Sequence, residues 1–152
     1  MASLNPVHWE TITSQMREIL QFVGQRPFAR RFYLAGGTAL ALRLGHRRSV
    51  DFDFFSASDE VTRTTRQEIL QALTPLAPQA LEDADGNLLL RVQDVHVGFF
   101  GYGYSLLTPT DDVEGVQVAS IVDVGLMKLD ALCPRFRVDG GRKFGFVREC
   151  RS

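Results

Sequence analysis

Apolar residues recur along the chain with two spacings, one typical of helices and one of strands. The three- to four-residue spacing predicts helices over residues 5–24, 38–44, 59–73 and 120–132. Gly24 and Pro27 end the first of these, and Gly45 ends the second. Ser58 or Asp59 would cap the start of the third.

Shorter apolar runs, bounded by turn residues, predict the strands. They cover residues 31–35, 50–55, 79–82, 88–92, 95–100 and 116–119. The runs 79–82 and 88–92 form a predicted hairpin around the turn 83–87. Residues 101–115 contain Gly, Pro and paired Asp and predict a loop. We therefore expect helices and strands as far as residue 132.

From Pro134 onward the sequence has neither a helical nor a clean strand period. The chain of 152 residues has the length of one domain. We therefore expect one domain over residues 1–133 and a weakly ordered tail over residues 134–152.

Composition narrows the class of protein. A hydrophobic content of 45% and a charged content of 23% are ordinary for a soluble domain. The net charge of −1 means that any nucleic-acid site must be a local patch. Cys133 and Cys150 lack the spacing of a zinc site. Without an apolar run long enough for a membrane span or a signal-peptide layout, we expect a cytoplasmic protein that does not contact the membrane.

Asp51 and Asp53 interrupt the apolar strand 50–55. Because side chains alternate along a strand, both carboxylates should point to one face. Burying two carboxylates is costly unless a metal ion or arginine compensates. The pair therefore predicts a site for Mg²⁺, and the structural alternative is an ion pair with Arg47 or Arg48.

Gly36, Gly37 and Thr38 join an apolar strand to the start of a helix. Backbone amides at such a junction favour phosphate binding. The alternative is a tight turn in which glycine only supplies a positive φ. Coupled to Asp51 and Asp53, the junction predicts that its amides and the Thr38 hydroxyl hold a triphosphate bridged by Mg²⁺, and hence nucleotidyl or phosphoryl transfer.

A basic loop, His46-Arg47-Arg48-Ser49, connects the predicted helix to the carboxylate strand. As a group these residues could neutralise phosphate oxygens, with arginine binding in a bidentate manner. For any single residue, a solvated loop position is the alternative. We include Arg47, Arg48 and Ser49 among the candidate nucleotide-binding residues.

Residues 34–41 (Leu-Ala-Gly-Gly-Thr-Ala-Leu-Ala) and 45–55 (Gly-His-Arg-Arg-Ser-Val-Asp-Phe-Asp-Phe-Phe) together resemble the AbiEii-type minimal nucleotidyltransferases. These are bacterial toxins of abortive-infection and toxin–antitoxin systems, with a polymerase-beta-type fold. The resemblance covers about residues 30–132 by layout. It implies an α/β (α+β) fold with a mixed sheet flanked by helices, and a site for an NTP with Mg²⁺ or Mn²⁺. It also implies nucleotidyl transfer to an acceptor such as tRNA, and a cognate antitoxin protein as a partner.

The resemblance also implies roles for individual residues. Asp51 and Asp53 would be catalytic and would bind the metal, while Gly36, Gly37 and Thr38 would bind the nucleotide. Lys128, on the predicted helix 120–132, matches a family lysine that reaches the nucleotide phosphates. A lone helical lysine more simply extends into solvent, and this alternative stays open.

Two departures from the family pattern weaken the case for turnover. Gly98 stands where related enzymes have a third carboxylate, although Asp94 or His96 could substitute for it. The tail also lacks the family's helical segment, so we expect it to be truncated or altered. The alternative function is a catalytically impaired nucleotide-binding or protein-interaction module of the same fold. A further alternative is a fragment that binds nothing.

Overall fold

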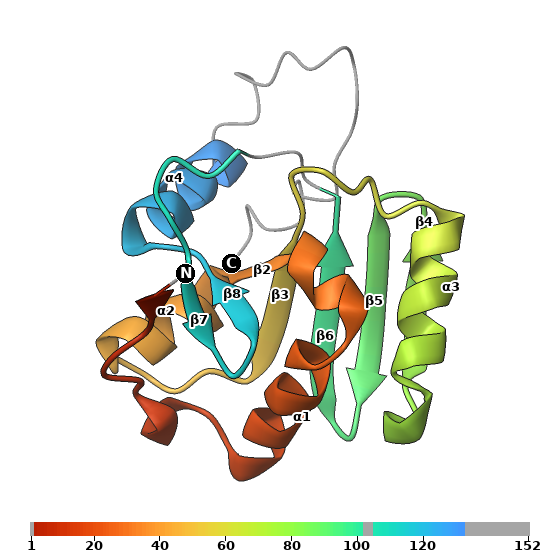
Figure 1. Ribbon diagram of the computed structural model, residues 1–152, viewed down its shortest axis with the longest axis horizontal. Coiled ribbons are helices and arrows are strands. Elements are labelled where there is room, and N and C mark those ends of the chain that lie inside the picture. The colour runs from red at the N-terminus through yellow and green to blue at the C-terminus, as the bar shows by residue number, and fades with distance from the viewer. Residues whose placement is uncertain (1, 102–104, 133–152) are drawn as a thin grey trace.

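The computed structural model describes residues 2–101 and 105–132, which form one mixed sheet with helices around it (Figure 1). The strands are β1 (Ala2–Ser3), β2 (Tyr33–Ala35), β3 (Asp51–Phe55), β4 (Gln79–Ala84), β5 (Asn87–Val92), β6 (Val95–Phe100), β7 (Asp111–Val113) and β8 (Val116–Val118). The α-helices are α1 (Ser14–Gly24), α2 (Gly36–Leu44), α3 (Arg63–Ala72) and α4 (Ile121–Leu132). Short 3-10 helices cover Trp9–Thr11, Pro27–Arg31 and Thr74–Leu76.

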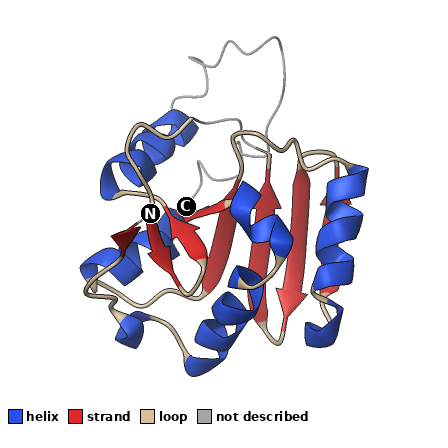
Figure 2. Cartoon of the chain, viewed as in Figure 1, coloured by secondary structure: helices blue, strands red, loops and turns tan. Residues whose placement is uncertain are grey.

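The eight strands follow the order β1-β7-β8-β2-β3-β6-β5-β4 (Figure 2). Strand β3 lies at the centre, antiparallel to β2 and parallel to β6. The sheet is therefore mixed, as the family resemblance implied. Helices α1 and α3 lie on the near side of the sheet in Figure 1, and α2 lies behind β7 and β8.

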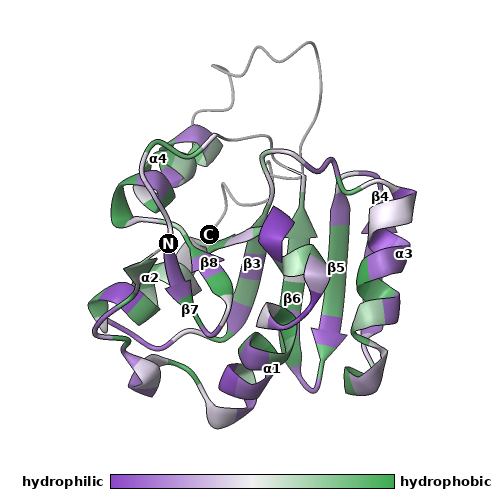
Figure 3. Ribbon diagram, viewed as in Figure 1, coloured by the Kyte–Doolittle hydropathy of each residue, from purple (hydrophilic) through white to green (hydrophobic). Residues whose placement is uncertain are grey.

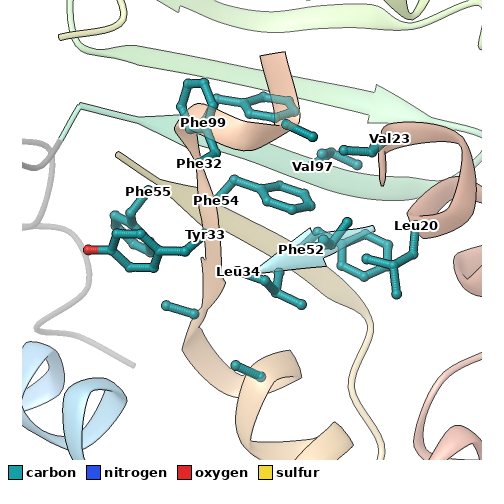
Figure 4. Close-up of a cluster of buried hydrophobic side chains, with 14 of the residues drawn as sticks. Leu20, Val23, Phe32, Tyr33, Leu34, Phe52, Phe54, Phe55, Val97 and Phe99 are labelled. Carbon is teal, nitrogen blue, oxygen red and sulfur yellow. The ribbon is translucent and has the colours of Figure 1, made fainter. Parts of the chain in front are cut away.

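The main core lies on the face of the sheet that α1 and the 3-10 helix Pro27–Arg31 cover. Phe54 of β3 stacks on Phe99 of β6 with ring centroids 5.1 Å apart, and Phe28 and Phe32 meet Phe99 edge-on (Figure 4). Offset and edge-on ring pairs add to the free energy that burial of these large side chains supplies. Figure 3 shows the matching hydropathy, with the central strand β6 largely hydrophobic.

One buried arginine ties α3 to the β4–β5 hairpin. Arg66 is 7% exposed, and its guanidinium pairs with Asp83 and Asp85 while also donating to the Val61 carbonyl. Burial of the guanidinium opposes its charged form, but the hydrogen bonds to Asp83 and Asp85 raise the pKa of Arg66 above its usual value. This ion-pair cluster fixes the outer half of the sheet against α3.

The structure corrects two helix boundaries. The predicted helix 5–24 is divided into the 3-10 helix Trp9–Thr11 and α1, whose N-cap is Thr13. Helix α3 begins at Arg63, not after Ser58 or Asp59. The Asp59 carboxylate instead accepts hydrogen bonds from the Val61 N–H and from Arg31, so it is occupied by the loop before the helix.

The predicted loop 101–115 is also wrong in part, because it contains β7, which pairs with β1 and β8. Such a short strand, beginning with two aspartates, has too little alternation to be detected from the sequence. The predicted tail, 134–152, lies outside the described residues. Among the helices described, none has both the length and the apolar composition to cross a membrane.

Candidate active site

Strand β3 carries Asp51 and Asp53 on one face and buries the alternating Phe52 and Phe54 on the other. Phe52 is fully buried and Phe54 is 2% exposed, whereas Asp51 is exposed and Asp53 is half-buried. The alternation is therefore as predicted. The two carboxylates lie on the sheet face opposite the main core and are accessible to a ligand.

The N-terminus of α2 lies directly beside Asp53. Gly36 adopts a φ of +67°, and a Cβ at this position would lie 2.7 Å from Asp53 Oδ2. No side chain caps the helix, since its N-cap residue is Ala35. Glycine is required here both by the backbone conformation and by the close approach of the carboxylate. The structure thus brings Gly36 and Asp53 close together.

Gly37 leaves room for an arginine from the basic loop. A Cβ at Gly37 would lie 2.8 Å from Arg47 Nη2 and 4.0 Å from Ser49 Oγ. Arg47 and Ser49 therefore reach the start of α2 from the loop before β3. The positive end of the helix dipole and a guanidinium group meet at one point, an arrangement suited to an anion.

Thr38 connects α2 to β3. The residue is 2% exposed, its hydroxyl donates to the Asp51 carbonyl, and the hydroxyl oxygen lies 2.5 Å from Ser49 Oγ. In this structure the Thr38 hydroxyl thus positions the carboxylate strand relative to the helix. Its contact with a triphosphate stays a prediction.

The alternative of a structural ion pair is not observed. Within residues 2–101 and 105–132, neither Arg47 nor Arg48 forms an ion pair, and both are exposed. Asp51 instead lies 3.6 Å from His96 Nδ1, with both side chains about half-exposed. The two arginines are therefore available to a ligand.

Strand β6 runs beside β3 with Gly98 opposite Asp53 and His96 opposite Asp51. Gly98 thus occupies the position predicted for a third carboxylate. A Cβ at Gly98 would lie 2.6 Å from Cζ of Phe100, so the aromatic ring covers this position. Neither the glycine nor the ring can accept a proton.

The candidate substitutes for the third carboxylate differ in position. His96 lies on the carboxylate face, as predicted. Asp94 does not: it lies in the turn before β6 with a φ of +73°, because Gln93 and Asp94 connect β5 to β6. Lys128 is exposed on α4, which packs against α2, and its contact with a nucleotide stays a prediction.

One acidic residue with a clear role was missed. Asp123 is fully buried at the start of α4, where its carboxylate accepts hydrogen bonds from the N–H groups of Leu107 and Thr108 and from the Ser120 hydroxyl. Burial opposes ionisation of this carboxyl, but these hydrogen bonds hold its pKa below the usual value. The signal was the capping sequence Ser120-Ile-Val-Asp123, in which the Asp123 N–H donates to Ser120 Oγ.

The two aspartates suit a magnesium ion better than a metal whose ligands all come from the protein. In the described part of the chain, no group of three or more His, Cys, Asp or Glu side chains could hold a metal. Magnesium is typically bound by one or two carboxylates, with water and substrate phosphates completing its shell. Asp51 and Asp53 fit that pattern, since Asp53 lies beside a helix start whose backbone amides suit an anion.

The comparisons with known proteins agree with this geometry. Residues 19–114 match the family model described as nucleotidyl transferase AbiEii toxin, type IV toxin–antitoxin system. An uncharacterised protein of Aquifex aeolicus is 32% identical over 127 residues, which are 82% of this chain and 61% of that protein.

Solved structures show the same fold. A protein of Thermotoga maritima, described as a candidate nucleotidyltransferase, has a TM-score of 0.57 at 12% identity, over 78% of this chain and 86% of that one. The antibiotic-resistance factor ANT(2″)-Ia, in complex with adenylyl-2″-tobramycin, has a TM-score of 0.54 at 16% identity, over 91% and 87%. A candidate nucleotidyltransferase of H. pylori has a TM-score of 0.50 at 20% identity, over 90% and 60%. The chain thus spans about three fifths of the length of its A. aeolicus and H. pylori relatives.

Proposed function

Because this chain belongs to the AbiEii family of nucleotidyltransferase toxins, we propose that it transfers a nucleotidyl group from an NTP to an acceptor, with Mg²⁺ or Mn²⁺ as the cofactor. The observation that carries the proposal is the approach of the Asp53 carboxylate to Gly36 at the start of α2. The Asp53 carboxylate, which would bind the metal, lies beside a helix start whose amides would bind the phosphates. A site that joins these two features suits a metal-bound triphosphate.

Different residues of the site would bind the triphosphate and the divalent ion. The amides at the start of α2, with Arg47 and Ser49, would bind the triphosphate oxygens. Asp51 and Asp53 would bind the divalent ion, which neutralises phosphate charge as it develops during transfer. Positioning and electrostatic stabilisation supply most of the rate enhancement in such reactions. Arg48 and Lys128 are proposed as further cations near the phosphates.

We propose tRNA as the acceptor and an antitoxin protein as the partner on the basis of the family. A cytoplasmic location follows from the same assignment. The family match supports these proposals but does not identify the acceptor.

The test combines binding with transfer. Thermal-shift and calorimetric titrations with each Mg²⁺–NTP should reveal binding, because a ligand of the folded state stabilises it. Radiolabel from an α-³²P-labelled NTP should then appear in bulk tRNA, and Asp53→Ala should abolish this labelling. No thermal shift with any Mg²⁺–NTP would contradict the proposal.

One observation favours a second function, a nucleotide-binding module without turnover. Phe100 covers Gly98, so the side chain that would remove a proton from the acceptor is missing at that position. A module would show a thermal shift with Mg²⁺–NTP that Asp51→Ala weakens, with no label in any acceptor. An enzyme would show the same shift together with label transfer.

A further inference from the structure

One row of residues extends the carboxylate face of the sheet beyond the predicted site. Asp51 of β3 pairs with His96 of β6, and His96 pairs with Arg91 of β5. Directly paired residues on neighbouring strands point to the same face of a sheet. Arg91 therefore lies on the same face as Asp51, two strands away. No sequence pattern marks this arginine, because its alignment with Asp51 depends on the register of three strands.

Arg91 differs from the arginines that hold the fold together. Arg31, Arg43 and Arg66 each pair with at least one carboxylate. Arg91 is exposed, and no acidic partner contacts it in the part of the chain that the structure describes. Its guanidinium is thus available to an external anion, as is that of Arg47, which lies at the start of α2 on the other side of the carboxylates.

The geometry of transfer implies that the triphosphate and the acceptor bind on opposite sides of the two carboxylates. The start of α2, with Arg47, lies on the β2 side of Asp53, and this is the proposed triphosphate side. In phosphoryl transfer the attacking and leaving oxygens lie roughly in line on opposite sides of the phosphorus. The acceptor must then approach from the other side, where β6 and β5 lie (Figure 1).

We propose that Arg91 binds a backbone phosphate of a nucleic-acid acceptor on the β5–β6 side of the carboxylates, with His96 between the phosphate and the reacting hydroxyl. This inference rests on the proposed nucleotidyl transfer to tRNA and adds to it a residue that would bind the acceptor and the side from which the acceptor would approach. A guanidinium suits phosphate through its planar, bidentate hydrogen bonds. A neutral small acceptor would gain nothing from a positive charge at this distance from the carboxylates.

The experiment measures binding of fluorescently labelled bulk tRNA by anisotropy over a series of salt concentrations. We expect Arg91→Ala to weaken binding roughly five- to tenfold at ~0.1 M salt and to lower the slope of log K against log salt by about one. Arg91→Lys, which keeps the charge, should retain most of the affinity. The matched control is Arg63→Ala, because Arg63 is also exposed and unpaired among the described residues, but lies at the start of α3 on the opposite face.

A second measurement separates this inference from the proposed function. The thermal shift with Mg²⁺–NTP should be unchanged in Arg91→Ala, since Arg91 lies away from the triphosphate side. If wild-type protein binds Mg²⁺–NTP but Arg91→Ala and Arg63→Ala affect tRNA binding equally, the inference about Arg91 is wrong and the nucleotide site stands. Equal labelling of tRNA by Arg91→Ala and wild type at limiting tRNA would also overturn the inference. If wild type binds no Mg²⁺–NTP, the proposed function itself fails.

Discussion

Two acidic sites in this protein show opposite uses of a carboxylate. Asp123 is fully buried, and backbone N–H groups and hydroxyls surround its oxygens. Asp51 has a half-exposed side chain, and its described ionic contact is with His96 at 3.6 Å. A carboxylate whose oxygens are satisfied inside the protein supports structure, whereas a half-exposed carboxylate such as that of Asp51 can be reached by a cation. The variants below test this distinction.

The largest effect is expected at Asp53. Asp53→Ala removes a proposed metal ligand, so nucleotidyl transfer should fall roughly 10³-fold, as when a main electrostatic group of an active site is lost. The melting temperature should change little, because the side chain is half-buried and outside the main core. Initial rates of label transfer and thermal unfolding are measured together.

Asp94→Asn is the matched control for Asp53→Ala. Asp94 is an exposed aspartate in the turn before β6, and asparagine tolerates its positive φ. Its transfer rate should stay within about twofold of wild type, since Asp94 is an exposed turn residue outside the pairing that aligns β6 with the carboxylate strand. A large loss in Asp94→Asn would show that Asp94 does contribute to the reaction.

The opposite pattern is expected at Asp123. Asp123→Ala removes a fully buried carboxylate that accepts hydrogen bonds from the N–H groups of Leu107 and Thr108 and from two hydroxyls, which should lower the free energy of unfolding by about 3 kcal/mol. Urea unfolding gives this value. Binding of Mg²⁺–NTP to the folded fraction should persist. A variant as stable as wild type would contradict the structural role of this carboxylate.

Asp123 should also make stability depend on acid pH. Its pKa is lowered in the folded state, so its contribution is fully present above the unfolded value of about 3.9 and is lost as the pH falls through the folded pKa. The stability difference between wild type and Asp123→Asn should therefore shrink at the most acid pH at which wild type stays folded. Urea titrations at a series of pH values measure it, and a difference that grows as the pH falls would contradict the assignment.

The smallest effect is expected at Gly98. Gly98→Ala places a methyl group against the Phe100 ring and should cost about 1 kcal/mol, because the end of that side chain can shift. In the Phe100→Leu background the cost should be smaller, and this coupling is measured by a double-mutant cycle. Equal costs in both backgrounds would show that Phe100 does not restrict this position.

Much of the site could be predicted because its residues are close in the chain. Gly36, Gly37, Asp51 and Asp53 lie within one strand–helix–strand unit, so local rules place the helix start and the alternation of β3. The ends of helices were less predictable. At α3, the sequence predicts Ser58 or Asp59 as the cap, whereas the helix begins at Arg63, because the Asp59 carboxylate binds Arg31 and the Val61 N–H instead.

The sequence by itself determined the type of each central element, the facing of Asp51 and Asp53, and the family. These depend on periods and spacings over a few residues, where the backbone geometry leaves few choices. Only the tertiary structure decided that the Phe100 ring covers Gly98, that Arg91 aligns with His96 and Asp51, and that Asp123 is buried. The reason is that strand register and burial depend on contacts between residues far apart in the chain, which a one-residue shift in pairing would change completely.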